Sequence, residues 1–303
     1  MDFSNMIKKG TVKKAPRLMM IGVEGVGKSS AGADLPSPIF LCAESGLVGP
    51  QFADSAHITP KDWEESLAFL DWLAMGQHDY KSLVVDTLDW LEKLLFAIVV
   101  RNAKKQDIKS ITDFDYGKGY EIAAFEFRQF IARLDKLNDN GMTVLLLAHS
   151  QIKTFNNPIG ENYDRYEAKC CKQIAGLAKE WCDAVLFAFF DVYTKKDGGK
   201  AKGNGGQVRV VKTEHSAGWD AKNRYGLPET MPLDMQLIMS EIDKGQPQNE
   251  TEMRQELLDI MPELPADKQA SLREWINKKK YTSSQLAQTL NRARAQVESN
   301  KGQ

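Results

Sequence analysis

The chain has 303 residues and a formal net charge of −1, from 40 lysines and arginines against 41 aspartates and glutamates. That length can bury a full hydrophobic core and suits one large domain with a small appendage. Because the charges balance, no overall basic field marks the chain for a polyanionic partner, and contact with nucleic acid would need local basic patches. The longest apolar runs, such as 94–100, are too short to span a bilayer.

The first residues are basic but lack the apolar segment of a secretory signal, so we expect a cytoplasmic protein with no membrane partner. The four cysteines form no C-x-x-C pair, and Cys170 and Cys171 are adjacent. We expect them to be reduced thiols, which argues against a disulfide scaffold and against a zinc site.

Short apolar runs rich in β-forming residues alternate with helix-like stretches along most of the chain. This alternation predicts an α/β fold with a mostly parallel central sheet and helices on both faces. A helix is expected at Thr59-Pro60-Lys61-Asp62, which offers an N-cap and a proline at the first helical position. We expect strands over 18–23, 38–42, 83–85, 143–148, 184–192 and 208–212, and further helices over 88–104, 120–138 and 169–181.

The glycine-rich, basic segment 194–207 separates the last two expected strands and is typical of a long hairpin tip. The pattern breaks near Lys244, and the residues after it predict three helices, over 252–261, 267–279 and 283–297. A Thr282/Gln285 capping box precedes the last of them. We therefore divide the chain into an N-terminal arm (1–16), an α/β core (17–243) and a C-terminal helical region (244–303).

Residues 22–29 read G-V-E-G-V-G-K-S and fit the ATP-binding P-loop pattern G-x-x-x-x-G-K-[ST] between an expected strand and a helix start. The glycines let backbone N–H groups turn inward around phosphates, Lys28 would hold the β and γ oxygens, and the Ser29 hydroxyl would ligate Mg²⁺. The alternative is a glycine-rich turn with an unrelated lysine. The predicted nucleotide contacts are Gly22, Glu24, Gly25, Val26, Gly27, Lys28, Ser29 and Ser30.

A P-loop needs a second magnesium anchor at the end of a neighbouring strand, and the run Ser82-Leu-Val-Val-Asp86 fits that pattern. We predict that Asp86 is this Walker B acid. The alternative is that Asp86 only caps the helix that begins near Leu88.

Hydrolysis also needs a carboxylate that orients or deprotonates the attacking water, and Glu44 follows the expected strand 38–42 at the edge where ligands gather in such sheets. We predict that Glu44 is the general base, with an ordinary surface glutamate as the alternative. His149 ends the strand 143–148 at the same edge, where it could sense the γ-phosphate. A hydrogen-bonded histidine at a strand end is the other interpretation.

The order of these elements is similar to that of the RecA superfamily, and Lys222-Asn223-Arg224 resembles the K-N-[KR] element of RecA, RadA and replicative helicases. Over residues 15–243 the chain most resembles phage-encoded ATP-binding proteins with a minimal RecA-like core, some of them single-strand annealing recombinases of the Sak group. The resemblance implies that Lys222 and Arg224 reach the γ-phosphate of a neighbouring subunit, and hence head-to-tail self-association as a filament or ring. Solvated loop charges are the alternative.

In RecA-like proteins single-stranded DNA lies along two loops, whose positional equivalents here are 101–120 and 153–166. Both mix cations, which neutralise phosphates, with aromatic rings, which stack on bases. Ordinary loop composition explains the same residues. The DNA contacts that the resemblance implies are Lys104, Lys105, Lys109, Lys118, Lys153, Phe155 and Arg165.

Together these features predict a DNA-stimulated, Mg²⁺-dependent ATPase that assembles on single-stranded DNA for recombination or annealing, in the host cytoplasm if it is phage-encoded. A single-strand-binding protein is a further expected partner. Three alternatives remain open: a hexameric helicase-like motor, a P-loop kinase of a small molecule, and a nucleotide-gated DNA-coating or adaptor protein with negligible turnover.

Overall fold

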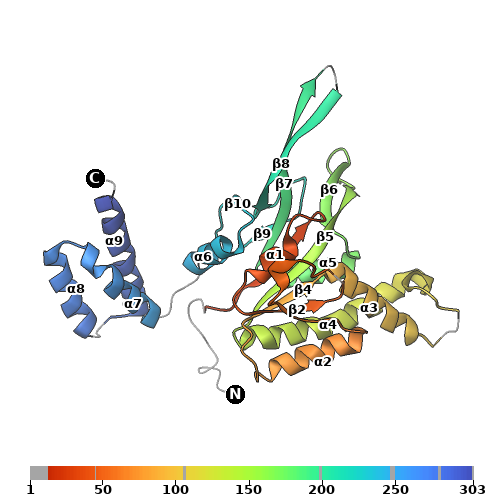
Figure 1. Cartoon of the computed structure of the whole chain (residues 1–303), viewed down its shortest axis with the longest axis horizontal. Coiled ribbons are helices and arrows are strands. Elements are labelled where there is room, and N and C mark those ends of the chain that lie inside the picture. Colours follow the sequence, from red (N-terminus) through yellow and green to blue (C-terminus); the bar gives the residue numbers. More distant parts are fainter. Residues whose placement is uncertain are drawn as a thin grey trace. The chain divides into compact units, whose positions relative to one another are not determined.

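The computed structural model describes residues 13–301 apart from residues 45, 105–106, 198–199, 246–249 and 279–280. The chain divides into two compact units, one over Lys14–Gly245 and a second that contains the residues from Gln246 onward (Figure 1). Most of the expected N-terminal arm lies outside the described residues, as does Lys105, one of the predicted DNA contacts.

The larger unit is built on one sheet with the order β10-β8-β7-β1-β5-β4-β2-β3, with β6 paired to β5 and β9 paired to β7. The strands from β7 to β3 pair in parallel, and β6, β8, β9 and β10 pair antiparallel to their neighbours. The predicted α/β fold with a mostly parallel sheet is therefore confirmed. The strands are β1 (Arg17–Gly22), β2 (Pro38–Cys42), β3 (Ala56–Ile58), β4 (Ser82–Asp86), β5 (Thr143–Phe155), β6 (Tyr163–Ala168), β7 (Ala184–Asp197), β8 (Lys200–Lys212), β9 (Lys222–Asn223) and β10 (Thr230–Pro232).

Apolar side chains on both faces of the sheet explain the helices on both sides, because a strand directs successive side chains to opposite faces. Met19 and Ile21 of β1 belong to one core cluster, whereas Leu18 and Met20 belong to the other. The first cluster is covered by helices α2 to α5, and the second by α1 and α6. Their bounds are α1 (Lys28–Ala33), α2 (Trp63–Ala74), α3 (Leu88–Arg101), α4 (Lys118–Asp139), α5 (Lys172–Trp181) and α6 (Met235–Gly245), with 3-10 turns at Pro50–Phe52, Ile111–Asp113 and Asp115–Gly117.

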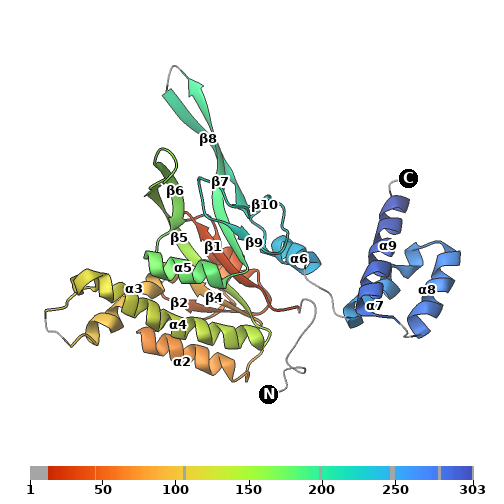
Figure 2. The same ribbon diagram turned by 180° about the vertical axis from the view of Figure 1, so that it is seen from behind.

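Two strands continue beyond the edge of the sheet at which β1 ends. Gly22, the last residue of β1, lies opposite His149 of β5 and Ala188 of β7. Beyond these positions β5 pairs with β6 up to Phe155, and β7 pairs with β8 up to Asp197. Figures 1 and 2 show both hairpins rising on the side of the sheet where the loop from β1 to α1 lies.

The hairpins correct two expectations. The strand expected over 143–148 runs to Phe155, and much of the segment 153–166 is paired rather than a loop. The glycine-rich segment 194–207 lies in a hairpin, as predicted, but β7 and β8 extend into it on both sides. Cross-strand pairing determines how far both strands run, and no local sequence pattern predicts this pairing.

Helix α2 begins later than its capping signal suggested. Asp62 is the N-cap, and its carboxylate accepts a hydrogen bond of 2.8 Å from the backbone N–H of Glu65. The prediction that Pro60 occupies the first helical position is therefore wrong. An aspartate at the cap satisfies a backbone donor that would otherwise lack a partner, which a proline ring cannot do.

The smaller unit contains α7 (Glu250–Ile260), a 3-10 turn at Met261–Glu263, α8 (Ala266–Lys278) and α9 (Ser283–Lys301). Its core consists of residues such as Leu257, Ile276 and Leu286, none more than 1 % exposed. The predicted capping box is confirmed, because Thr282 and Gln285 exchange hydrogen bonds of 2.8 and 3.3 Å. No described helix of either unit has both the length and the apolar character needed to cross a membrane.

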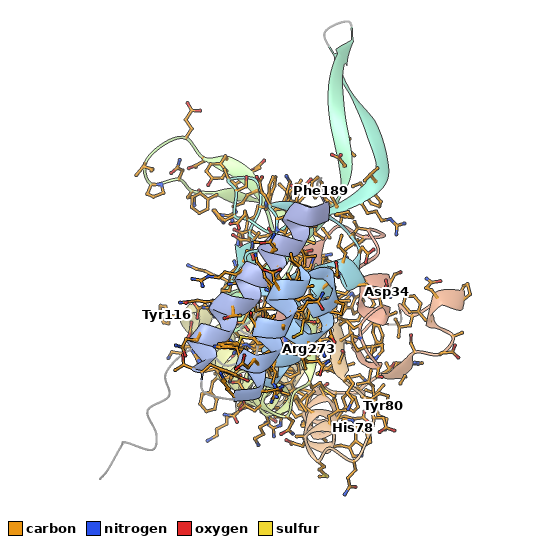
Figure 3. All side chains as sticks on the ribbon, turned by 90° about the vertical axis from the view of Figure 1, so that its left-hand side faces the viewer. Asp34, His78, Tyr80, Tyr116, Phe189 and Arg273 are labelled. Atoms are coloured by element: carbon orange, nitrogen blue, oxygen red, sulfur yellow. The ribbon has the colours of Figure 1, made fainter. Side chains whose placement is uncertain are left out.

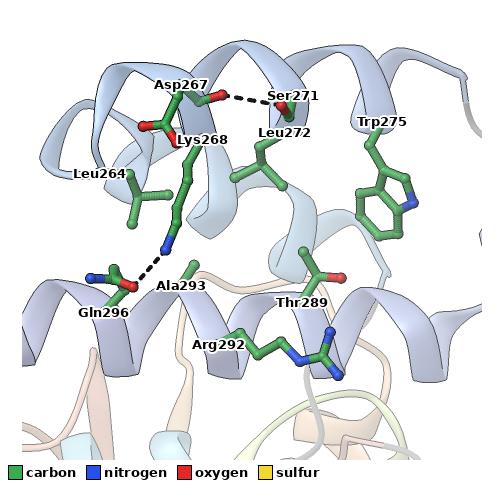
Figure 4. Close-up of a pocket in the computed structure, with 10 residues that line it drawn as sticks. All are labelled: Leu264, Asp267, Lys268, Ser271, Leu272, Trp275, Thr289, Arg292, Ala293 and Gln296. Atoms are coloured by element: carbon green, nitrogen blue, oxygen red, sulfur yellow. Dashed lines mark hydrogen bonds between the residues drawn. The ribbon is translucent and has the colours of Figure 1, made fainter.

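A cavity of about 540 Å³ lies between α8 and α9, lined by Leu272, Trp275 and Ala293 among others (Figure 4). Lys268 crosses its mouth and donates a 2.7 Å hydrogen bond to Gln296. The apolar residues that line the cavity belong to the core of this unit or pack against it.

Candidate nucleotide site

Three glycines give the loop after β1 its shape. A Cβ atom on Gly22 would lie 2.6 Å from the carbonyl oxygen of Ala188, so only glycine fits beside β7. Gly25 and Gly27 have φ values of 74° and 102°, in the region that other residues rarely adopt. The loop therefore takes a conformation that requires glycine at positions 22, 25 and 27, and all three belong to the predicted P-loop.

Lys28 is buried at the start of α1, and its ammonium group is bound to its own loop. Nζ donates to the carbonyl oxygens of Gly22 and Val23 at 3.1 and 3.0 Å. Burial lowers the pKa of Lys28, and the negative charges of Asp86 and Asp89 oppose that shift. A charged triphosphate is a stronger acceptor than two carbonyl groups, so a nucleotide can displace these contacts.

Asp86 ends β4 and is hydrogen-bonded to the hydroxyl of Ser29. Burial raises the pKa of Asp86, while the bond from Ser29 and the charge of Lys28 oppose the rise. We expected Asp86 to end a strand next to β1, but β5 lies between β1 and β4. Both strands nevertheless end at one edge, which places a hydroxyl and a carboxylate together as Mg²⁺ ligands require.

Glu44 lies at the same edge, just after β2. Cys42 is in register with Asp86, and the backbone N–H groups of Ala43 and Glu44 donate to the Asp86 carbonyl oxygen at 2.9 and 3.4 Å. The carboxylate is partly buried, and its charge acts on the pKa of Lys28 together with that of Glu24. The structure thus brings Glu44 to the P-loop, where its role as a base remains a prediction.

His149 lies in register with Gly22 and is held by a carboxylate that the sequence reasoning missed. Asp89, in the first turn of α3, accepts hydrogen bonds of 3.0 Å from both the backbone N–H and Nδ1 of His149. Burial opposes the ionisation of Asp89, but the bonds from His149 outweigh it and lower the pKa of Asp89. Asp89 follows Asp86 by three residues, but that spacing does not reveal that its side chain faces His149.

A family model described as an AAA domain matches residues 14–225, which is more than half of the chain. The chain belongs to the AAA domain family. The matched residues include the P-loop, Glu44, Asp86 and His149, and the protein is accordingly a nucleotide-binding P-loop ATPase. No curated protein matches the sequence. A crystal structure of the RadB recombinase is similar over 66% of this chain and 81% of its own, with 13% identity and a TM-score of 0.36.

The AAA domain holds Lys222 and Arg224 far from its own P-loop. Lys222 pairs with Val185 near the start of β7, whereas the P-loop follows Gly22, which pairs with Ala188 at the opposite end of the sheet. The structure therefore does not bring these two cations to the nucleotide site of the same chain.

Both cations already have partners within the chain. Nζ of Lys222 donates to three carbonyl oxygens at the end of α5, those of Lys179, Glu180 and Cys182. Arg224 is 57% exposed and forms a 3.0 Å ion pair with Asp183. Neither is simply a solvated loop charge, and Lys222 acts as a C-terminal cap of α5.

Arg165, one of the predicted DNA contacts, is buried and paired within the chain. Its side chain is only 7% exposed and pairs with Asp220, and its guanidinium lies 5.5 Å from the centre of the Phe155 ring. Asp220 also accepts a 2.6 Å bond from Lys179. A cation compensated in this way is not available to a phosphate, and the pairing spans 55 residues, so no local pattern revealed it.

The other predicted DNA contacts lie on two separate projections of the AAA domain. Lys104 and Lys109 belong to the connection between α3 and α4, and Lys118 is the first residue of α4, whereas Lys153 and Phe155 belong to the β5–β6 hairpin (Figures 1 and 2). Tyr116, in the first of these segments, is 98% exposed and lies at the periphery in Figure 3. The three lysines of this projection are exposed.

Proposed function

We propose that this protein is a RecA-like ATPase that assembles head to tail on single-stranded DNA and serves recombination or annealing. The observation that carries the proposal is the meeting of five groups at one sheet edge: Lys28, Ser29, Asp86, Glu44 and His149. Each has the chemistry that ATP hydrolysis requires at that place.

The local geometry fits ATP with Mg²⁺. The positive φ values of Gly25 and Gly27 permit the tight turn in which backbone N–H groups of the loop would surround phosphates, and Lys28 supplies a buried positive charge. Ser29 and Asp86 would hold the metal, whose charge neutralises the phosphates when it is bound. Glu44 would orient or deprotonate water.

His149 offers a route from nucleotide to DNA. The strand that carries it, β5, continues without interruption into the hairpin that bears Lys153 and Phe155. A displacement of His149 by a nucleotide would move the base of this hairpin, since the backbone N–H of Lys169, which directly follows β6, donates to the His149 carbonyl oxygen at 2.8 Å. DNA bound to the hairpin would then alter hydrolysis reciprocally.

The position of Arg224 supports assembly. The side chain is exposed at the end of the sheet opposite the P-loop, so it would serve the nucleotide of another subunit and not that of its own chain. Lys222, two residues before Arg224, holds this segment against α5 by capping the C-terminus of that helix. Head-to-tail stacking brings the exposed cation of one copy to the P-loop edge of the next.

The test is the ATP hydrolysis rate of the full chain with and without single-stranded DNA, at low and high salt, with Lys28→Ala as the inactive control. We expect DNA to raise the rate and salt to weaken that effect, because phosphate contacts release counterions. A rate that DNA leaves unchanged, with no DNA bound in a direct assay, would refute the proposal and favour the small-molecule kinase.

A further inference from the structure

Arg209 of β8 lies over the P-loop of its own chain. Its neighbour two residues on, Val211, is fully buried in the cluster that α1 and α6 cover, so Arg209 faces the same side of the sheet. A Cβ atom on Gly27 would lie 2.9 Å from Nη1 of Arg209 and 3.8 Å from its Cζ. The guanidinium therefore rests directly against the phosphate-binding loop.

The backbone that carries Arg209 is fixed on both sides. Arg209 pairs with Phe190 of β7, and its carbonyl oxygen accepts a 3.0 Å hydrogen bond from the N–H of Leu233. Leu233 itself lies 3.8 Å from the same Cβ position on Gly27. The approach of Arg209 to the loop is thus set by the sheet and not by a mobile segment.

Within the described part of the chain the guanidinium of Arg209 has no ion pair and no hydrogen bond. Its nearest aromatic contact is distant, with Cζ 5.9 Å from the centre of the Phe190 ring. The acids at this edge act on Lys28, whose pKa is influenced by Asp86 and Glu44 among others. Arg209 is exposed, so water solvates the guanidinium in the absence of a ligand, and an anion bound between it and the loop would gain a charge-assisted hydrogen bond.

We propose that Arg209 contacts the phosphate chain of the nucleotide from within the same subunit. The inference rests on the proposed binding of ATP at the P-loop and adds a binding residue to it. Arg209 differs in this respect from Arg224, because it lies at the P-loop of its own chain and serves binding whether or not subunits assemble.

The experiment measures the Kd of Mg²⁺-ATP and of tripolyphosphate by calorimetry for the wild type, Arg209→Ala, Arg209→Lys and Arg128→Ala. Arg128 is an exposed arginine on α4, which covers the other face of the sheet, and controls for the loss of one charge. We expect Arg209→Ala to weaken both ligands by about tenfold, as for the loss of a charge-assisted hydrogen bond. Arg209→Lys should lose less, and Arg128→Ala should match the wild type.

The melting temperature without ligand shows whether each variant is folded, and Arg209→Lys keeps the test valid if the alanine variant unfolds. Wild-type affinity in both Arg209 variants would overturn the inference. Weakened ATP binding with unchanged tripolyphosphate binding would also overturn it, because the guanidinium would then face the base or the ribose. Failure of the wild type to bind either ligand would instead refute the proposed function itself.

Discussion

Replacement of Lys222 by methionine separates a structural role of this residue from a catalytic one. Methionine keeps most of the apolar stem and removes the ammonium group. In the native structure that group donates to the carbonyl oxygens of Lys179 and Glu180 at 3.0 Å each, and to that of Cys182. These carbonyl oxygens lie at the C-terminus of α5, where a helix carries partial negative charge.

The expected loss of stability is about 1–2 kcal/mol. A hydrogen bond to a charged group contributes about 1.5–3 kcal/mol, and a cation at a helix C-terminus about 0.3–1 kcal/mol. Lys222 is only partly buried, so water would replace much of what the three hydrogen bonds contribute. Burial also lowers the pKa of Lys222, which means that desolvation of the ammonium offsets part of their contribution. The lower end of the single-bond range is therefore the better guide.

Urea unfolding of the full chain measures this change, with Lys61→Met as the matched control. Lys61 is 86% exposed before α2, and its only ion pair within the described residues is a 4.0 Å contact with Glu65. We expect Lys222→Met to lose stability and to keep the ATPase rate per folded molecule. Unchanged stability combined with lost hydrolysis would refute the capping role and establish Lys222 as the cation that acts on a neighbouring subunit.

Two further predictions concern the buried acids. Asp86→Asn should abolish Mg²⁺-ATP binding and yet raise the free energy of unfolding at pH 7 without ligand. The native pKa of Asp86 lies above its usual value of 3.8, so the wild type loses stability as the pH rises above 3.8, and the loss is complete above the raised native pKa. Urea titrations of both proteins should converge below about pH 4, and an Asn variant less stable at every pH would contradict the assignment. Asp89→Asn should lower stability by about 1–2 kcal/mol at pH 7, because the native pKa of Asp89 is lowered and its ionised form is favoured above pH 3.8. That loss of stability should shrink as the pH falls through the lowered pKa of Asp89. Hydrolysis should also fall, because the amide of the asparagine would present a donor to Nδ1 of His149. An unchanged hydrolysis rate would remove His149 from the mechanism.

The elements and the P-loop were predictable because their signals are local. The strand predicted over 38–42 matches β2 in both bounds, and the glycines within 22–27 indicate the positive φ values that other residues avoid. The pairing of β5 with β6 was not predictable, since 149–155 has a mixed polar pattern that becomes a strand only beside its partner. Local sequence also says nothing about which side of α3 faces the sheet edge, and so Asp89 was missed.

Charged partners that are distant in sequence account for further contacts that the sequence did not reveal. Arg165 and Asp220 are 55 residues apart, and Lys222 lies 40 residues from the carbonyl of Cys182. A lysine or an arginine in a predicted loop carries no sign of whether a carboxylate or a helix end will meet it after folding. The sequence therefore reveals the chemistry of such residues but not whether that chemistry is free to act on a ligand.

The charges at the P-loop edge indicate that this site is assembled at a cost to the unliganded protein. Burial raises the pKa of Asp86 and lowers the pKa of Lys28, because desolvation disfavours the charged form of each. Arg209 adds a cation with no partner among the described residues. Mg²⁺ would neutralise Asp86 and phosphates would neutralise Lys28, which offsets the two desolvation costs, and the exposed Arg209 would add a further contact to the phosphates. Binding of Mg²⁺-ATP should consequently raise the free energy of unfolding of the larger unit, and Arg209→Ala should lose part of that stabilisation whereas Asp86→Asn should lose all of it.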